Sequence, residues 1–226
     1  MAHWNPKIVT SGLTFCLDAA NIKSYPKSGT SWTDLCSNNS GTLISSPTFQ
    51  TENGGCIVLD GTSYVSVQNS PDLNLTAFTY CGWIKNTDNS LFWNRVMSKK
   101  LNYTDSDGYE ISLATVSDMT LYIGGSSGSF ATISNLTTWL DYKWHYLAVV
   151  FNGTNVKAYC DGVYKGQGSI AQVVSNSRDL LLGRIEGEAE LTQWIGKMGH
   201  VSMYNRALSE NEIKQNHEAL RWRFGV

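Results

Sequence analysis

The chain has 226 residues and a formal net charge of −2, and 16% of its residues are charged, below the roughly 25% typical of soluble domains. This balance, with no basic cluster beyond the tail Arg221-Trp222-Arg223, argues against nucleic-acid binding by phosphate neutralisation. No long apolar run follows Met1-Ala2-His3, so we expect neither a signal peptide nor a membrane-inserted segment. The length suits one large β domain, and we predict a single domain over residues 1–226.

Short apolar runs alternate with turns rich in Gly, Asn, Ser and Asp from residue 13 onward. β-branched and aromatic residues predominate in these runs, which is typical of strands in a sandwich or barrel. The pattern therefore predicts an all-β fold. The clearest expected strands cover residues 13–17, 57–59, 64–67, 78–84, 109–113, 120–123, 145–151, 156–160, 180–182 and 199–204.

The strand expected over residues 145–151 is apolar on both alternating faces, which indicates a central strand that is buried on both sides. Asn152-Gly153 follows it and predicts a hairpin into residues 156–160. Asp161-Gly162 predicts a second turn, into Val163-Tyr164. The region therefore reads as a meander of antiparallel strands.

One short helix is expected near the C-terminus, over residues 209–220. Ser209 followed three residues later by Glu212 is a capping-box pattern. Ile213, His217 and Leu220 then recur at i, i+4 and i+7, so one face of the helix is narrow and apolar. We expect this helix to lie as a plug over the end of the sandwich, and residues 1–12 to form an N-terminal arm.

Calcium is the ion that the loops suit best, because it takes several carboxylate, amide and carbonyl oxygens. The candidate ligands are Asp34 with Asn39, in a run that also holds Asn38, and Asp60. The structural alternative is that Asp34 starts an Asx-turn and that Asp60-Gly61 is a plain turn. The run 105–108 is similar to the start of an EF-hand calcium loop but lacks the downstream glutamate at the right offset.

Aromatic side chains are the candidate carbohydrate platforms. The chain has 8 tryptophans and 11 tyrosines, and aromatic rings both stack on sugars and fill cores. Trp93, Trp139 and Trp194 lie near expected loops or strand ends, so they are the candidate carbohydrate-binding residues. Packing is the alternative role for each of them.

Glu186, Glu188 and Glu190 are the strongest hint of catalysis, since alternate glutamates on a strand share a face, as hydrolysis by two carboxylates needs. Gly187 interrupts that strand, however, and the segment falls where a loop is expected. The histidines lack metal-ligand spacing, and no nucleophile motif or phosphate loop is present. We therefore expect a protein without catalytic activity.

Several motifs together resemble one family. They are Leu17-Asp18-Ala19-Ala20-Asn21, Trp32-Thr33-Asp34-Leu35, Ile57-Val58-Leu59-Asp60-Gly61, Phe78-Thr79-Tyr80-Cys81-Gly82-Trp83, Trp144-His145-Tyr146, Tyr159-Cys160-Asp161-Gly162 and Tyr204-Asn205-Arg206-Ala207-Leu208-Ser209. In this order they resemble the concanavalin A-like lectin/glucanase superfamily, and its laminin-G-like branch most of all. The segments 5–10 and 223–225 resemble versions found in structural proteins of tailed bacteriophages.

The resemblance implies a jelly-roll sandwich of two antiparallel sheets, often with calcium, that commonly binds glycans or proteins. Two departures affect the calcium site: Cys36-Ser37 stands where relatives often have Ser-Gly, so a glycine is lost, and His200 stands where many have an acidic residue. Fold alone leaves the function open.

From this resemblance we expect a non-enzymatic phage virion protein, a head decoration or a tail or fibre component, that binds host-surface glycans. It would be made in the host cytoplasm, displayed on the virion surface and attached to other virion proteins. Since viral appendages are often trimeric, a homotrimer is one expected assembly. The alternatives are a stand-alone carbohydrate-binding lectin and, third, a glycoside hydrolase or polysaccharide lyase.

Overall fold

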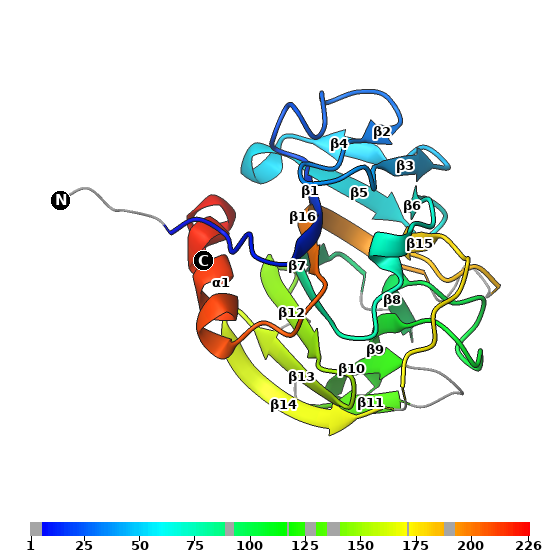
Figure 1. Cartoon of the computed structure of the whole chain (residues 1–226). Coiled ribbons are helices and arrows are strands. Elements are labelled where there is room, and N and C mark those ends of the chain that lie inside the picture. Colours follow the sequence, from blue (N-terminus) through cyan, green and yellow to red (C-terminus); the bar gives the residue numbers. More distant parts are fainter. Residues whose placement is uncertain are drawn as a thin grey trace.

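The computed structural model describes residues 6–88, 93–116, 118–124, 130–134, 141–170, 172–187 and 193–226, and these form two antiparallel sheets and one α-helix (Figure 1). The all-β prediction, two sheets with one C-terminal helix, is confirmed. Among these residues, no helix combines the length and apolar character that a membrane crossing requires.

Sheet A contains the strands on which the helix packs. Its order is β14-β13-β12-β7-β16-β5-β4, and β1 also pairs with β16. The first and last strands of the chain are therefore neighbours, with Cys16 opposite Ser202. The strands are β1 (Leu13–Asp18), β4 (Thr48–Gln50), β5 (Cys56–Asp60), β7 (Phe78–Asn86), β12 (His145–Phe151), β13 (Asn155–Cys160), β14 (Val163–Ser169) and β16 (Ile195–Tyr204).

Sheet B forms the second layer, with the order β11-β10-β9-β8-β15-β6-β3-β2. Its strands are β2 (Ser31–Trp32), β3 (Gly41–Ile44), β6 (Tyr64–Val67), β8 (Trp93–Ser98), β9 (Glu110–Val116), β10 (Asp118–Gly124), β11 (Phe130–Ile133) and β15 (Leu180–Leu182). The 3₁₀ turn η1 (Glu52–Gly54) connects β4 to β5 within sheet A, and the 3₁₀ turn η2 (Pro71–Leu73) connects β6 of sheet B to β7 of sheet A.

The main core lies between the sheets and follows from strand alternation. On β7, Phe78, Tyr80 and Ile84 point into this core, whereas Cys81 and Trp83 belong to a second apolar cluster on the outer face of sheet A. The second cluster requires a cover, because a sheet that is apolar on both faces is stable only when both faces are buried.

The cover is α1 (Glu210–Phe224), which lies across the outer face of sheet A (Figure 1). The capping box of Ser209 and Glu212 is formed, and Gly225 ends the helix in the left-handed conformation with φ of 76°. Phe224 stacks on Trp83 with a centroid distance of 4.4 Å.

Two expectations about the helix were wrong. It continues to Phe224, four residues beyond the predicted end, and it covers a sheet face instead of plugging the end of the sandwich. The physical reason for both is the apolar outer face of β7 and β12, where Trp83 and Tyr146 lie.

The described part of the expected N-terminal arm, residues 6–12, runs along α1. The Val9 N–H donates to Asn216 Oδ1 at 2.7 Å, and Gln215 Nε2 donates to the Lys7 carbonyl at 2.8 Å. The arm and α1 therefore lie together on the same side of the molecule.

Candidate functional site

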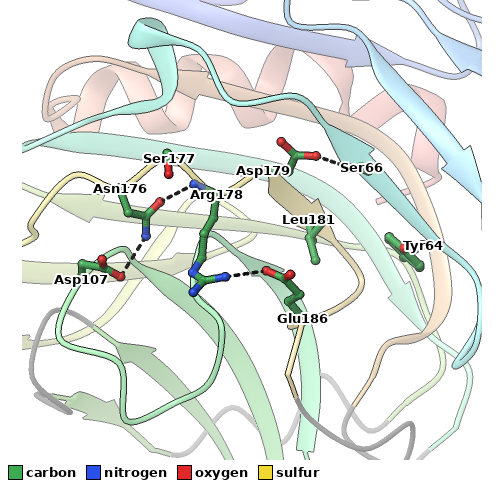
Figure 2. A pocket seen from close by; sticks show the side chains of 9 residues that line it. All are labelled: Tyr64, Ser66, Asp107, Asn176, Ser177, Arg178, Asp179, Leu181 and Glu186. Carbon is green, nitrogen blue, oxygen red and sulfur yellow. Dashed lines mark hydrogen bonds and ion pairs between the residues drawn. The ribbon is translucent and has the colours of Figure 1, made fainter.

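A cleft of about 540 Å³ lies on the outer face of sheet B, on the side away from α1. Two strands and three loop segments contribute to it. The lining residues, all drawn in Figure 2, are Tyr64 and Ser66 of β6, Leu181 of β15, Asp107 of the turn before β9, Asn176, Ser177, Arg178 and Asp179 of the segment before β15, and Glu186 after β15.

The alternation of side chains along β6 determines which residues form the floor of this cleft. Val65 and Val67 of β6 are fully buried in the core, so Tyr64 and Ser66 point the other way, to the outer face. Leu181 pairs with Ser66 and points outward in the same row. The floor therefore offers one aromatic ring, one hydroxyl and one aliphatic side chain.

The walls are polar and hold one another by hydrogen bonds (Figure 2). Arg178 Nη1 donates to Glu186 Oε2 at 2.9 Å, and Asn176 Nδ2 donates to Asp107 Oδ1 at 3.1 Å. Ser66 Oγ donates to Asp179 Oδ2 at 3.1 Å. Three carboxylates and one guanidinium give the lining an excess of negative charge, as well as carboxylate, amide and hydroxyl groups that can bind the hydroxyls of a polar ligand.

Tyr64 supplies the aromatic ring of the cleft, and the guanidinium of Arg184 lies over this ring. Arg184 Cζ is 5.0 Å from the ring centroid, within the range of a cation–π contact. The ring is half-buried. Its environment therefore fixes its orientation before any ligand binds.

Two of the three predicted carbohydrate-binding tryptophans, Trp93 and Trp194, do not form one site. Trp194 is fully buried in the core between the sheets, where a sugar cannot reach it. Trp93 is half-buried at the start of β8, with Arg95 Cζ 5.2 Å from its ring centroid. Trp139 lies outside the described residues. Neither Trp93 nor Trp194 lines the cleft.

Asp34, the main predicted calcium ligand, is buried with its carboxylate facing hydrogen-bond donors. Oδ1 accepts from the backbone N–H groups of Cys16 and Cys36, at 2.9 and 3.1 Å. Oδ2 accepts from the Ser37 hydroxyl and from the Asn39 N–H. A cation here would face these donors, so the residues do not fit calcium as they lie.

Asp60, the other predicted ligand, closes a turn. Its Oδ1 accepts from the backbone N–H and the hydroxyl of both Thr62 and Ser63, at 2.8 to 3.0 Å, and these bonds hold the pKa of Asp60 well below its usual range. The two predicted ligands lie at different places along β16. Asp60 pairs with Ile195 at the start of this strand. Cys16, whose backbone N–H donates to Asp34, pairs with Ser202 near its end. Seven residues at about 3.3 Å each separate the two places by about 20 Å.

The acidic segment considered for catalysis is only partly described. Glu186 binds Arg178 and lines the cleft, while Glu188 and Glu190 lie outside the described residues. In the run 105–108, the Asp105 carboxylate accepts from the Leu101 N–H at 2.7 Å, and Asp107 accepts from Asn176. These acids take part in the structure of the cleft and of its supporting loop.

A second polar cluster lies at the other sheet, where His145 of β12 sits between two carboxylates. Nδ1 is 2.7 Å from Asp161 Oδ2, and Nε2 is 3.0 Å from Asp141 Oδ1. Burial alone would lower the pKa of His145, but hydrogen bonds with Asp161 and Cys160 outweigh it and raise the pKa to about 10. The imidazolium therefore supplies the positive charge of this cluster, which explains it as an internal ion pair.

The geometry of two jelly-roll sheets with one covering helix agrees with the family comparison. A laminin G model, described as the concanavalin A-like lectin/glucanases superfamily, matches residues 59–214. The chain belongs to this superfamily. No curated protein matches the sequence.

Solved structures show the same fold at low sequence identity. Domain 4 of AbnA, a GH43 extracellular arabinanase from Geobacillus stearothermophilus in complex with arabinotriose, has a TM-score of 0.65 and 18% identity, over 95% of this chain and all of that domain. The binding domain of Paraclostridial Mosquitocidal Protein 1 has a TM-score of 0.66 and 19% identity, over 91% of this chain and 52% of that one. The botulinum neurotoxin serotype D binding domain has a TM-score of 0.67 and 13% identity, over 92% and 51%.

The lectin-like fold is thus shared with domains whose names refer to binding and with one solved in complex with a sugar. This chain spans about half the length of the two toxin binding domains and the full length of the arabinanase domain. At these identities the likeness establishes the architecture alone.

Sequence reasoning did not find the cleft, because its residues come from four separate places in the chain. The one usable signal is the outward position of Tyr64 and Ser66 in the alternating strand 64–67.

Proposed function

We propose that this protein is a non-catalytic carbohydrate-binding module and that the cleft on sheet B holds a segment of a glycan chain. The observation that carries this proposal is the lining itself, in which four charged side chains and an amide surround a floor with one aromatic ring. Sugars offer many hydroxyls to such groups and an apolar face to a ring. Membership of a lectin-like superfamily supports the same proposal.

A glycan array with the purified chain, followed by calorimetry on any ligand found, tests this function. Tyr64→Ala and Asp179→Asn are expected to weaken binding at least tenfold, because each removes a group that points into the cleft. Glu210→Gln, on the exposed first turn of α1, is the matched control and leaves affinity unchanged. Binding that is unaffected by both cleft variants would reject the cleft as the site.

Catalysis by a glycoside hydrolase or polysaccharide lyase is the competing function. Glu186, whose segment 186–190 is described only as far as residue 187, lines the cleft and forms an ion pair with Arg178. Incubation with the ligand from the array and measurement of reducing ends or unsaturated products tests this. Turnover that Glu186→Gln abolishes would replace the binding module by an enzyme.

We further propose that the module is displayed on the surface of a bacteriophage particle, with other virion proteins as partners. The sequence of the segments 5–10 and 223–225 supports this, and their described parts lie on the α1 side. Attachment through that side leaves the cleft exposed to a host-surface glycan. Mass spectrometry of purified particles is expected to detect the chain, and its absence from them would overturn this location.

A further inference from the structure

Lys99 directly follows β8 and ends in a cage of four oxygens, although its residue is only 1% exposed. Its Nζ lies 2.8 Å from Asn69 Oδ1 and 2.6 Å from the Arg178 carbonyl. The carbonyl and the side-chain oxygen of Asn176 complete the cage, each at 3.0 Å. Amide and backbone oxygens at such distances are the acceptors that the hydrogens of an ammonium require.

The cage determines where one wall of the cleft lies. Residues 174–179 belong to no strand, so the usual ladder of backbone hydrogen bonds does not hold them. Instead, Asn176 Nδ2 donates to the Lys99 carbonyl at 2.8 Å, and the Val174 carbonyl accepts from the Gly108 N–H at 2.7 Å. With the Nζ contacts, these bonds fix the segment that supplies four of the nine lining residues.

The charge of Lys99 matters as much as its position. An ammonium offers three hydrogens to the four oxygens, whereas a neutral amine offers two and turns a lone pair toward them. Burial lowers the pKa of Lys99 to about 8, and the carboxylates of Asp179 and Asp107 limit the fall. The charged form therefore predominates at neutral pH and is lost in mildly alkaline solution.

We propose that Lys99 is a positioning residue whose ammonium acts as a built-in cation for the cleft wall, in place of a bound metal ion. The part of this inference that concerns ligand affinity rests on the proposed glycan function, and the order of the wall does not. It follows that the segment 174–179 keeps its conformation without calcium. It also follows that removal of the amino group leaves a vacant cation site that an external alkylammonium ion can fill.

Hydrogen exchange of peptides that cover residues 174–179, measured without any glycan, tests the positioning role. Lys99→Met, which keeps the length of the side chain, is expected to raise exchange in this segment about tenfold or more while the central strands β7 and β12 stay protected. Lys100→Met is the matched control, because Lys100 is equally buried at 1% exposure but directs its Nζ to the Tyr103 carbonyl. Unchanged exchange in the Lys99→Met segment would overturn the proposal.

Chemical rescue shows whether the charge of Lys99 or only the volume of its side chain orders the segment 174–179. Lys99→Ala in propylammonium chloride is expected to regain most of the protection of residues 174–179, whereas equal propanol or sodium chloride is expected to leave it exchanging fast. Equal rescue by propanol would reduce Lys99 to a packing residue and overturn the proposal.

A third test uses the wild-type chain, so it does not depend on whether a variant folds. Exchange of residues 174–179, corrected for intrinsic rates and referenced to β12, is expected to rise between pH 7 and pH 9.5, and calcium chelation is expected to have no effect at either pH. A segment that stays equally protected at both pH values, or loosens on chelation, would contradict the built-in cation. If no glycan binds but this exchange pattern holds, only the proposed function fails; if glycans bind without it, only the role of Lys99 fails.

Discussion

Arg223 of α1 places its guanidinium Nη1 2.7 Å from Asp18 Oδ1, which joins the last helical turn to the end of β1. Both side chains are largely buried, at 8% and 18% exposure. The same guanidinium donates to the carbonyls of Asn53 and Gly55, at 2.6 and 2.9 Å. One side chain therefore ties together the first strand, the last helix and the η1 turn.

Arg223→Met is expected to lower the unfolding free energy by about 3 kcal/mol, because it leaves the Asp18 carboxylate without its cation. The melting temperature should fall by roughly 6–12 °C, which calorimetry can measure. Arg221→Met is the control, since Arg221 pairs with Glu218 at 48% and 37% exposure and should change stability by less than about 0.5 kcal/mol. Similar losses from both variants would contradict the role given to Arg223.

Phe224 docks α1 on sheet A by stacking on Trp83, with 8° between the ring planes. Phe224→Ala is expected to cost about 3–5 kcal/mol in urea unfolding, since it opens a cavity beneath the helix. Trp222→Ala removes a larger ring that is 65% exposed and should have little effect. If the exposed ring proved the costlier of the two, the packing of α1 described above would be incorrect.

Stability should depend on the charge of His145. The folded protein raises its pKa from 6.5 to about 10, so the folded state binds this proton more tightly than the unfolded chain does. The stabilisation is therefore complete below about pH 6.5 and is lost as the pH rises toward 10. The difference in unfolding free energy between the wild type and His145→Gln is expected to shrink over this range, as pH-dependent urea titrations can measure. A constant difference would show that the imidazole acts by packing alone.

Asp34 is expected to stabilise its loop through hydrogen bonds instead of a calcium ion. Asp34→Asn places an NH₂ group against donors and should cost about 1–3 kcal/mol, while chelation of calcium should leave the wild-type melting temperature unchanged. Asp60→Asn is the comparison variant and should cost less, because all four turn bonds reach the single oxygen Oδ1, which asparagine keeps. A melting temperature that falls on chelation would restore the calcium prediction for this loop.

Strand β12 shows what the sequence could predict. Its expected bounds, 145–151, agree with the structure because every residue in the run is buried and turns flank it. The bounds of β6 and β15 were also predicted correctly, and the capping box located the start of α1. In each case the local pattern and the tertiary environment favour the same structure.

Strand β8 shows where the sequence was insufficient. Asn94 and Arg95 interrupt its apolar pattern, yet both are buried, and Arg95 lies 3.5 Å from the equally buried Glu110 of β9. Arg95 thus has a partner that only the folded chain brings close. Edge strand β14 was missed beyond Tyr164 for the opposite reason, since most of its residues are exposed and carry no apolar period.

The candidate site could not be predicted from the sequence either, because its residues meet only in the folded chain. Asn69, Lys99 and Asn176 are each ordinary loop or strand-end residues, and nothing local indicates that they meet around one ammonium. Trp194 looked available because it precedes a strand, but the strand carries it into the core. Contacts between residues far apart in the chain determine both the arrangement around Lys99 and the burial of Trp194.

The pairing of β1 with β16 affects how the chain is made. β16 lies between β7 on one side and β1 with β5 on the other, so three strands pair with a segment that follows all of them in the chain and begins only at residue 195. Sheet A therefore cannot close until residues 195–204 have left the ribosome. A ribosome-stalled chain that ends before residue 195 would expose the edges of β7 and β5, which makes early termination a direct route to aggregation.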